Sequence, residues 1–283
     1  MKVGLNLLLW DANITEKHVN VLERLAELGY DGVEIPLFAF NKGTSKKLKK
    51  HLDRLKLKCT ITSCVPLEAN PISSEAPVRR KALNFMKKAI DNAAILGSET
   101  IMGPFTSPVG NLVGRPRTED EWKWGVDVMR KVATEAEKTG VTLALEALNR
   151  FETYFINTVG DACKFAKEVD HKNFKVTWDT FHANIEEENL TKAITAAGDM
   201  IGHVHVSENH RGIPGTGHIP FAATFRTLKK IKYDGWLTIE AFSSALPEIA
   251  AATCIWRDVY STQDELAVKS LEFVKKTWDK AKA

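Results

Sequence analysis

The sequence predicts a (β/α)₈ barrel, a TIM barrel, that spans residues 1–283 as a single domain. Short apolar runs rich in β-branched residues alternate with longer segments of helical periodicity along the whole chain. No linker or low-complexity segment interrupts this alternation. A chain of 283 residues is also an ordinary length for eight such units in one closed barrel. We therefore expect the active site at the carboxyl ends of the strands.

The eight predicted strands are largely apolar along their length, as strands buried on both faces are. In order, they cover Val3–Leu9, Gly32–Phe38, Cys59–Val65, Thr100–Gly103, Val141–Ala147, Lys175–Asp179, Ile201–Ser207 and Trp236–Ala241. The predicted helices cover Thr15–Leu28, Ser45–Leu55, Pro77–Leu96, Glu119–Lys138, Val159–Val169, Glu186–Ala197, Phe221–Ile231 and Asp264–Lys280. Four of these helices are followed by a glycine, which favours a left-handed helix end. These glycines are Gly29, Gly97, Gly140 and Gly198.

Charge and composition argue against several kinds of partner. The 39 basic and 36 acidic residues give a formal charge of +3, and no basic face of the kind that binds nucleic acid is evident. The densest basic run, Lys46–His51, has the pattern of the solvated face of an amphipathic helix. No stretch approaches the roughly 18 consecutive apolar residues of a membrane span. We expect neither a nucleic-acid nor a membrane partner.

Cysteine usage and the N-terminal segment indicate a cytoplasmic protein. The first ten residues contain only a short apolar run and are followed by Asp11, without a signal-peptide cleavage pattern. The four cysteines include no CxxC pair, so they are typical of reduced thiols. They are Cys59, Cys64, Cys163 and Cys254.

Four consecutive predicted strands carry a metal-competent side chain at or near their carboxyl ends. These side chains are Glu146, Asp179, His205 and Glu240. Three carboxylates that converge with one imidazole repel each other unless a cation lies between them. This oxygen-rich set suits one Mn²⁺ per subunit, with Co²⁺ or Mg²⁺ as alternatives, better than a tetrahedral zinc site. Each residue also has a structural interpretation, because Asp179 is placed to cap a helix and His205 to pack in the core.

Other polar residues are predicted around the same mouth. Glu152 and His182 follow the fifth and sixth strands, and Arg211 lies in the glycine-containing loop after the seventh. A phosphate-binding role for that loop stays open, because loops after strands 7 and 8 bind phosphate in many barrels. His203 shares a face with His205 and is interpreted as a supporting residue deeper in the barrel. The first three strands close with apolar or thiol side chains, for which rim packing and contact with a sugar are equally open. They are Trp10, Phe38 and Cys64.

At these motifs the sequence resembles the ketose 3-epimerases, a group that includes D-tagatose, D-psicose and L-ribulose 3-epimerases within the xylose-isomerase-like barrels. The resemblance spans nearly the whole chain, and four late motifs carry it: LEALNRFETYFINT, WDTFHANIEE, GHVHVSENHRGIPGTGHI and GWLTIEAF. It implies that the four strand-end residues bind the metal. It also implies that Glu152, His182 and Arg211 contact substrate, and that the protein is a homodimer or homotetramer. The segment SENHR departs from the family form, which leaves the preferred sugar open.

The expected reaction is epimerisation of a free ketose at carbon 3. The proton beside a ketose carbonyl is too weakly acidic for a carboxylate of pKa about 4 to remove unaided. A divalent metal would polarise the carbonyl and stabilise an enediolate. Glu146 and Glu240 come from strands three steps apart, so they can serve as an acid/base pair on opposite faces of the sugar.

Several other functions fit parts of the same pattern. An aldose–ketose isomerase resembling hydroxypyruvate isomerase and a sugar-phosphate 3-epimerase are the alternative activities. A three-zinc DNA-repair enzyme of the same superfamily needs further histidines near strands 3 and 4, where this chain has CVPLE and MGPFT. A sugar-binding barrel without catalysis is disfavoured by the paired glutamates.

Overall fold

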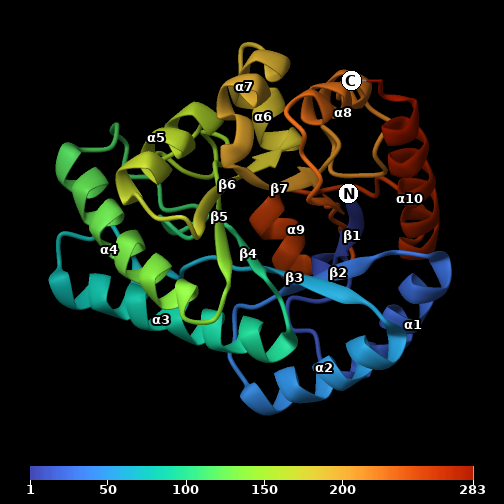
Figure 1. The fold of residues 1–283 in the computed structure, drawn as a ribbon, viewed down its shortest axis with the longest axis horizontal. Helices are drawn as coiled ribbons and strands as arrows, with labels where there is room; N and C mark the ends of the chain where they lie inside the picture. Colours follow the sequence, from blue (N-terminus) through green and yellow to red (C-terminus); the bar gives the residue numbers. More distant parts are fainter. Residues whose placement is uncertain (283) are drawn as a thin grey trace.

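A computed structural model describes residues 1–282 and shows a closed barrel of eight parallel strands. The strands follow one another around the barrel in chain order, and the first pairs with the last (Figure 1). Their bounds are β1 Lys2–Asn6, β2 Gly32–Pro36, β3 Lys58–Thr62, β4 Thr100–Gly103, β5 Thr142–Glu146, β6 Phe174–Asp179, β7 Ile201–Val206 and β8 Trp236–Ile239. The predicted fold class is therefore confirmed.

Helices surround the barrel and cover the outer faces of its strands (Figure 1). Their bounds are α1 Val19–Leu28, α2 Lys42–Leu55, α3 Ala76–Leu96, α4 Glu119–Glu137, α5 Val159–Val169, α6 Thr180–Glu186, α7 Leu190–Ala197, α8 Phe221–Lys230, α9 Pro247–Thr253 and α10 Gln263–Lys280. Gly29 and Gly97 end α1 and α3 with positive φ angles of 87° and 74°, as their position predicts.

Several elements differ from the sequence prediction in their bounds or in their number. The first strand ends at Asn6 instead of Leu9, because the Asn6 side chain accepts the backbone N–H of Leu8 and starts a 3₁₀ turn. The predicted helix Glu186–Ala197 corresponds to α7, which begins at Leu190, and the short helix α6 before it was not predicted. A new cap divides them, since the side chain of Asn189 accepts the backbone N–H of Lys192 at the start of α7. Helix α9 was not predicted.

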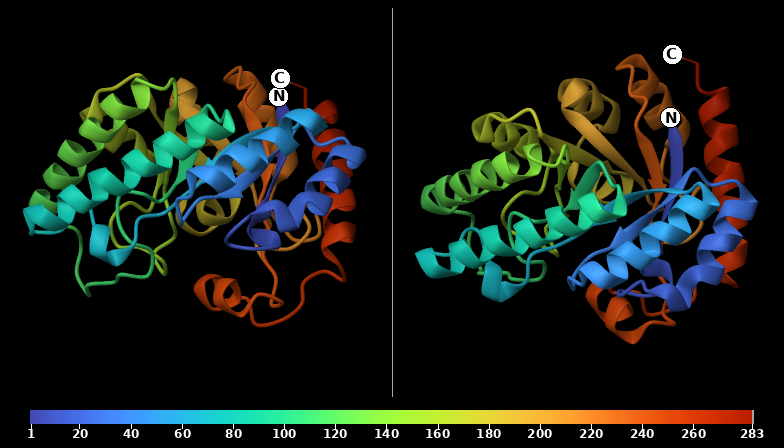
Figure 2. Two further views of the ribbon diagram at one scale, coloured as in Figure 1. Left: turned by 90° about the horizontal axis from the view of Figure 1, so that it is seen from below. Right: turned by 60° about the horizontal axis from the view of Figure 1, so that its bottom comes forward.

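The long connections lie on the side of the barrel that holds the carboxyl ends of the strands. Figure 2 shows α9, which belongs to the connection after β8, on the side opposite the two chain termini. Ion pairs of two arginines fix the connection after β4. Arg115 binds Glu121 at 2.8 and 2.9 Å, and Arg117 binds Asp161 at 2.8 Å. The backbone N–H of Gly110 also donates to the carbonyl of Glu152 at 2.8 Å, which joins this connection to the one after β5.

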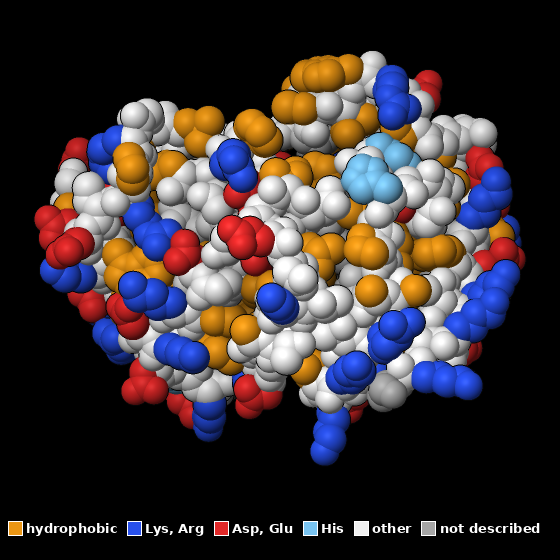
Figure 3. Space-filling view, turned by 90° about the horizontal axis from the view of Figure 1, so that it is seen from above, with side chains coloured by type: hydrophobic (Ala, Val, Ile, Leu, Met, Phe, Trp, Pro, Cys, Tyr) orange, Lys and Arg blue, Asp and Glu red, His pale blue; other side chains and the backbone are white. Residues whose placement is uncertain are grey.

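The outer surface mixes charges of both signs. On the face shown in Figure 3, lysine and arginine side chains are interspersed with acidic ones. The basic run Lys46–His51 lies on α2, where Leu48 is buried and Lys46 and Lys47 are exposed, as an amphipathic helix requires. Within the described residues, no helix is both long enough and apolar enough to cross a membrane.

Candidate active site

The four side chains expected at the strand ends meet at one point of the barrel mouth. Glu146 and Asp179 end β5 and β6, His205 is the penultimate residue of β7, and Glu240 follows β8 directly. His205 Nδ1 lies 3.4 Å from Glu146 Oε1, 3.5 Å from Asp179 Oδ2 and 3.4 Å from Glu240 Oε1. All four side chains are buried. One nitrogen and three oxygens therefore converge on one small volume.

The donor atoms in this cluster fit one divalent cation. Glu146 Oε1, Asp179 Oδ2 and His205 Nδ1 are buried and have no hydrogen-bond partner among the described residues. Leaving such atoms without a partner costs about 1–3 kcal/mol each, and more for charged groups. Ligand atoms held at about 2.0–2.2 Å from a single cation lie roughly 3–3.5 Å apart, which matches the spacing around His205. The carboxylate-rich set fits Mn²⁺, Mg²⁺ or Co²⁺.

Asp179 combines the structural and the metal-binding interpretations of its position. Its Oδ1 caps α6 by accepting the backbone N–H groups of Phe181 at 2.7 Å and His182 at 2.8 Å. Its Oδ2 is left facing the cluster. Burial opposes ionisation, but His182, His205 and the Arg211 guanidinium together hold the pKa of Asp179 well below its usual range. The cap thus orients the side chain and leaves one charged oxygen for the site.

The two glutamates of the cluster differ in their electrostatic surroundings. The pKa of Glu146 is raised to about 8, chiefly by burial, while His205 opposes the rise and the charges of Glu240 and Asp179 add to it. Burial also acts on Glu240, but His205 and Arg211 outweigh it and lower its pKa. Arg211 Nη1 donates to Glu240 Oε2 at 2.6 Å. Arg211 therefore lies against one glutamate of the cluster, Glu240, and stabilises its carboxylate.

Arg211 and His182 complete this side of the mouth. The Arg211 guanidinium carbon lies 3.6 Å from the ring centroid of Phe181, and Nη1 also donates to Ser207 Oγ at 2.8 Å. Its Nη2 lies 3.2 Å from His182 Nε2. His182 Nδ1 accepts the backbone N–H of Asn149 at 3.0 Å, and burial lowers the pKa of this histidine. A cation and a histidine that favours its neutral form thus stand beside Glu240.

Glu152 lies at the edge of the same mouth. It is half-buried, and its Oε1 accepts the side-chain amide of Asn149 at 2.8 Å. Its charge raises the pKa values of both His182 and Arg211. Burial outweighs this effect for His182, whereas for Arg211 the surrounding carboxylates, Glu240 first, outweigh burial. The three residues predicted to contact substrate are therefore brought together beside the metal-competent cluster.

The loop after β7 is organised by a carboxylate that sequence reasoning missed. Glu208 is fully buried and accepts the backbone N–H groups of Gly215 at 2.7 Å, Asn209 at 3.0 Å and Ile219 at 3.1 Å. A Cβ at Gly217 would lie 2.5 Å from Glu208 Oε1, so only glycine fits there. These backbone donors already bind an internal carboxylate, which weakens the phosphate-binding interpretation of this loop.

A second missed carboxylate, Glu34, lies inside the barrel in the middle of β2. It is fully buried, and its Oε1 is 2.6 Å from His205 Nε2. Its Oε2 lies 3.0 Å from His203 Nε2, which places His203 in the deeper, supporting position expected for it. Burial opposes ionisation of Glu34, but the two histidines hold its pKa well below its usual range. A glutamate within the apolar strand GVEIP was the available signal.

The ends of β1, β2 and β3 supply apolar surface. Phe38 packs against a small buried cluster of Leu8, Phe242 and Ile255, which joins the connections after β1, β2 and β8. Trp10 packs against the main core instead. Cys64 is partly buried, and burial together with the charge of Glu146 raises the pKa of its thiol to about 11.

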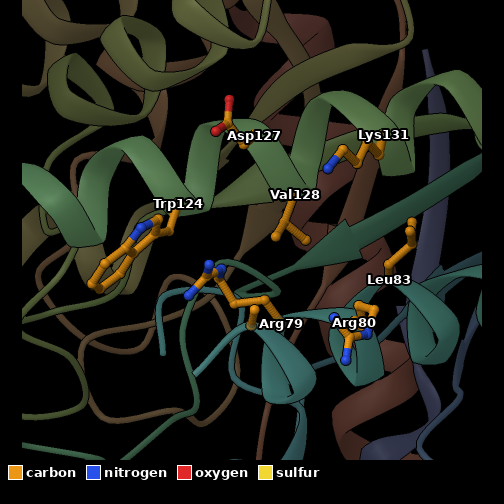
Figure 4. A pocket seen from close by; sticks show the side chains of 8 residues that line it. Arg79, Arg80, Leu83, Trp124, Asp127, Val128 and Lys131 are labelled. Carbon is orange, nitrogen blue, oxygen red and sulfur yellow. The ribbon is translucent and has the colours of Figure 1, made fainter. Parts of the chain in front are cut away.

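Two cavities differ in their relation to this site. A cleft of about 500 Å³ lies beside Arg211, and its lining includes Phe181, Ile255 and the exposed Trp256. A groove of about 280 Å³ lies between α3 and α4, on the outside of the barrel (Figure 4). There the Arg79 guanidinium carbon lies 4.8 Å from the ring centroid of Trp124. The first cleft adjoins the candidate site, whereas the groove contains none of the predicted site residues.

Comparisons of sequence and of structure with known proteins point to the same group of relatives. Residues 22–277 match the family described as xylose isomerase-like TIM barrel. An L-ribulose 3-epimerase from Methylomonas sp. (strain DH-1) is 33% identical over 255 residues, which cover 89% of each chain. A D-psicose 3-epimerase from Ruminiclostridium cellulolyticum is 33% identical over 270 residues, covering 94% of this chain and 92% of that protein. A crystal structure of a D-allulose 3-epimerase from Methylomonas sp. in complex with D-allulose has a TM-score of 0.92 at 31% identity, covering 98% of this chain and 97% of that one.

Proposed function

The chain belongs to the xylose isomerase-like TIM barrel family and is an isomerase, and we propose that it epimerises free ketohexoses or ketopentoses at carbon 3 with the help of one divalent metal. One observation carries the proposal. Glu146 and Glu240 come from the ends of β5 and β8, and each places a carboxylate oxygen 3.4 Å from the same atom, His205 Nδ1. An epimerase needs an acid and a base on opposite faces of one carbon, and two carboxyl groups from strands three steps apart would take these two roles.

Glu146, Asp179, His205 and Glu240 would hold the metal, with Mn²⁺ as the expected ion and Co²⁺ or Mg²⁺ as alternatives. Such an ion would act as a Lewis acid that polarises the ketose carbonyl and so raises the acidity of the neighbouring C–H bond. The buried atoms of Glu146, Asp179 and His205 that lack a hydrogen-bond partner support this assignment.

Glu240 and Glu146 would each exchange a proton with one of the two faces of carbon 3. In one direction, the Glu240 carboxylate removes the proton and an enediolate forms. Glu146 then returns a proton to the other face, and the roles reverse in the opposite direction. Arg211 is bonded to Glu240 and holds one of its oxygens in a fixed position. Binding of a cation lowers the basicity of a carboxylate, so each glutamate would exchange protons through an oxygen that the metal leaves free.

The remaining polar residues would orient the sugar. Arg211 and His182 lie side by side and would stabilise negative charge that develops on O2. Glu152, at the edge of the mouth, would bind the hydroxyl at the O1 end. We expect free ketoses to be preferred to their phosphate esters, because the Arg211 guanidinium at this mouth is already paired with Glu240.

The position of solvent label tests the reaction. The Mn²⁺-supplemented enzyme is incubated with D-psicose in D₂O, and NMR of the recovered sugars locates the deuterium. We expect deuterium at C3 together with the C3 epimer, because the proton that arrives comes from a different carboxylate than the one that removed it. Label at C1 with an aldose product would establish an aldose–ketose isomerase, and label at C4 would also overturn the proposal.

A further inference from the structure

His205 has two nitrogens that face different surroundings. Nδ1 faces the three carboxylates of the candidate metal site at 3.4–3.5 Å. Nε2 faces the barrel interior and lies 2.6 Å from Glu34 Oε1. Only a nitrogen without a proton can bind a metal, so the side on which His205 carries its proton decides whether it is a ligand.

Glu34 is held rigidly in its own place. Asn6 Nδ2 donates to its Oε1 at 3.0 Å, and Thr60 Oγ1 donates to its Oε2 at 2.9 Å. The barrel register places these three residues side by side on β1, β2 and β3. All three are buried, with Glu34 fully so. An ionised carboxylate at such depth is costly unless it is paired, and here the paired groups are the two histidines of β7.

We propose that Glu34 is a positioning residue for the metal site. As an acceptor-only group, its carboxylate requires His205 to carry a proton on Nε2, which leaves Nδ1 free to bind the cation. Its charge also makes His205 a more basic ligand, as carboxylates behind metal-bound histidines do. The inference rests on the proposed metal site and extends it to a residue on the opposite half of the barrel. His203 lies against the other carboxylate oxygen of Glu34, with its Nε2 3.0 Å from Oε2.

A change of Glu34 to glutamine separates this role from simple packing. Glutamine has nearly the same shape, but it lacks the charge and can donate a hydrogen bond to His205 Nε2. Where the amide nitrogen faces His205, the proton of His205 moves to Nδ1 and blocks the metal. Where the amide oxygen faces it, the loss of the negative charge still makes His205 a less basic ligand. Loss of such a supporting carboxylate typically weakens metal binding by about 10- to 100-fold.

The test measures Mn²⁺ affinity directly, by following free Mn²⁺ by electron paramagnetic resonance during titration of the metal-stripped full chain. We expect Glu34→Gln to raise the Kd about 10- to 100-fold and Glu34→Asp, which restores the charge, to bind Mn²⁺ more tightly than Glu34→Gln. A packing role predicts the reverse order, since glutamine preserves the volume and aspartate does not. An unchanged Kd in Glu34→Gln, or tighter binding by Glu34→Gln than by Glu34→Asp, would overturn the proposal.

Two further variants act as controls. Glu121→Gln removes another buried carboxylate, which binds Arg115 and Tyr154 away from the site, and we expect it to leave the Kd unchanged. Thr60→Val keeps the charge of Glu34 and removes one of its supports, so a rise of about 2- to 5-fold is expected. If Glu34→Gln does not fold, Thr60→Val decides, and a Kd equal to that of the unchanged protein would overturn the inference. Failure of the unchanged protein to bind Mn²⁺ would instead contradict the metal site itself.

Discussion

The two halves of the barrel mouth are chemically different. Strands β5 to β8 end in Glu146, Asp179, His205 and Glu240, whose donor atoms converge on one volume. The connections after β1, β2 and β3 contribute apolar or thiol side chains, including Phe38, which packs against a small buried cluster. The comparison teaches that one half of this mouth gathers charged groups, which suits the proposed metal and acid/base roles. The other half gathers apolar side chains, which suits the exclusion of water from the proposed reaction.

The halves are nevertheless connected through the barrel interior. TIM-barrel interiors are usually filled by branched apolar side chains. Here Glu34 of β2 reaches His205 of β7 across the interior, and Asn6 and Thr60 hold Glu34 from the neighbouring strands. Strands β1 to β3, whose connections form the apolar half of the mouth, therefore also supply the polar residues Asn6, Glu34 and Thr60 to the barrel interior.

Removal of the metal should have the largest effect. Exhaustive chelation should abolish activity, because Glu146, Asp179 and Glu240 would then face each other without a cation between them. Addition of Mn²⁺ or Co²⁺ should restore it, and elemental analysis of the reconstituted protein should find one ion per chain. Full activity after chelation, or three zinc ions per chain, would show that the β5–β8 half is not the proposed site.

The next effect concerns the acid/base pair within that half. Glu240→Gln should lower kcat by about 10³-fold or more, because it removes a proton-transfer group and leaves the buried Arg211 without its charged partner. Glu146→Gln should have an effect of similar size. Steady-state kinetics under saturating Mn²⁺ measures both, with bound metal quantified in parallel. Turnover of Glu240→Gln at the level of the unchanged enzyme would contradict the two-base scheme.

The smallest effect on catalysis is expected from a substitution in the apolar half of the mouth. Phe38→Ala removes contacts with Leu8, Phe242 and Ile255 and should raise KM by about 3- to 10-fold while kcat changes little. The Mn²⁺ affinity should not change, because Phe38 is not one of the converging donors. A large loss of metal affinity in this variant would show that the two halves are not separable.

Much of this molecule could be predicted from local patterns. Alternating apolar strands and amphipathic helices predict the barrel, and a polar residue at the carboxyl end of a strand is placed at the mouth by strand direction alone. For the same reason, the convergence of Glu146, Asp179, His205 and Glu240 followed from their positions in the sequence. The identity of the sugar does not follow from such patterns.

Other features depended on contacts that no local pattern encodes. At Asp179 the sequence pattern predicts two roles and cannot choose between them. Its position before a helix predicts a helix cap, and its position at a strand end predicts a metal ligand. The structure assigns one oxygen to each use. Helix α9 and the cluster around Phe242 likewise arise where the connection after β8 packs against those after β1 and β2. Short helices of this kind are stabilised mainly by packing, which the sequence does not display.

By itself, the sequence determined the order of the elements, the face of the barrel on which the candidate site lies, and the four residues that converge there. These follow from strand direction and side-chain periodicity, which are properties of neighbouring residues. Only the tertiary structure decided that Glu34 lies 2.6 Å from a histidine 171 positions later, and that Glu208 binds the backbone of its own loop. The physical reason is that barrel closure and interior packing choose which strands face each other across the interior, and this choice is a property of the whole chain.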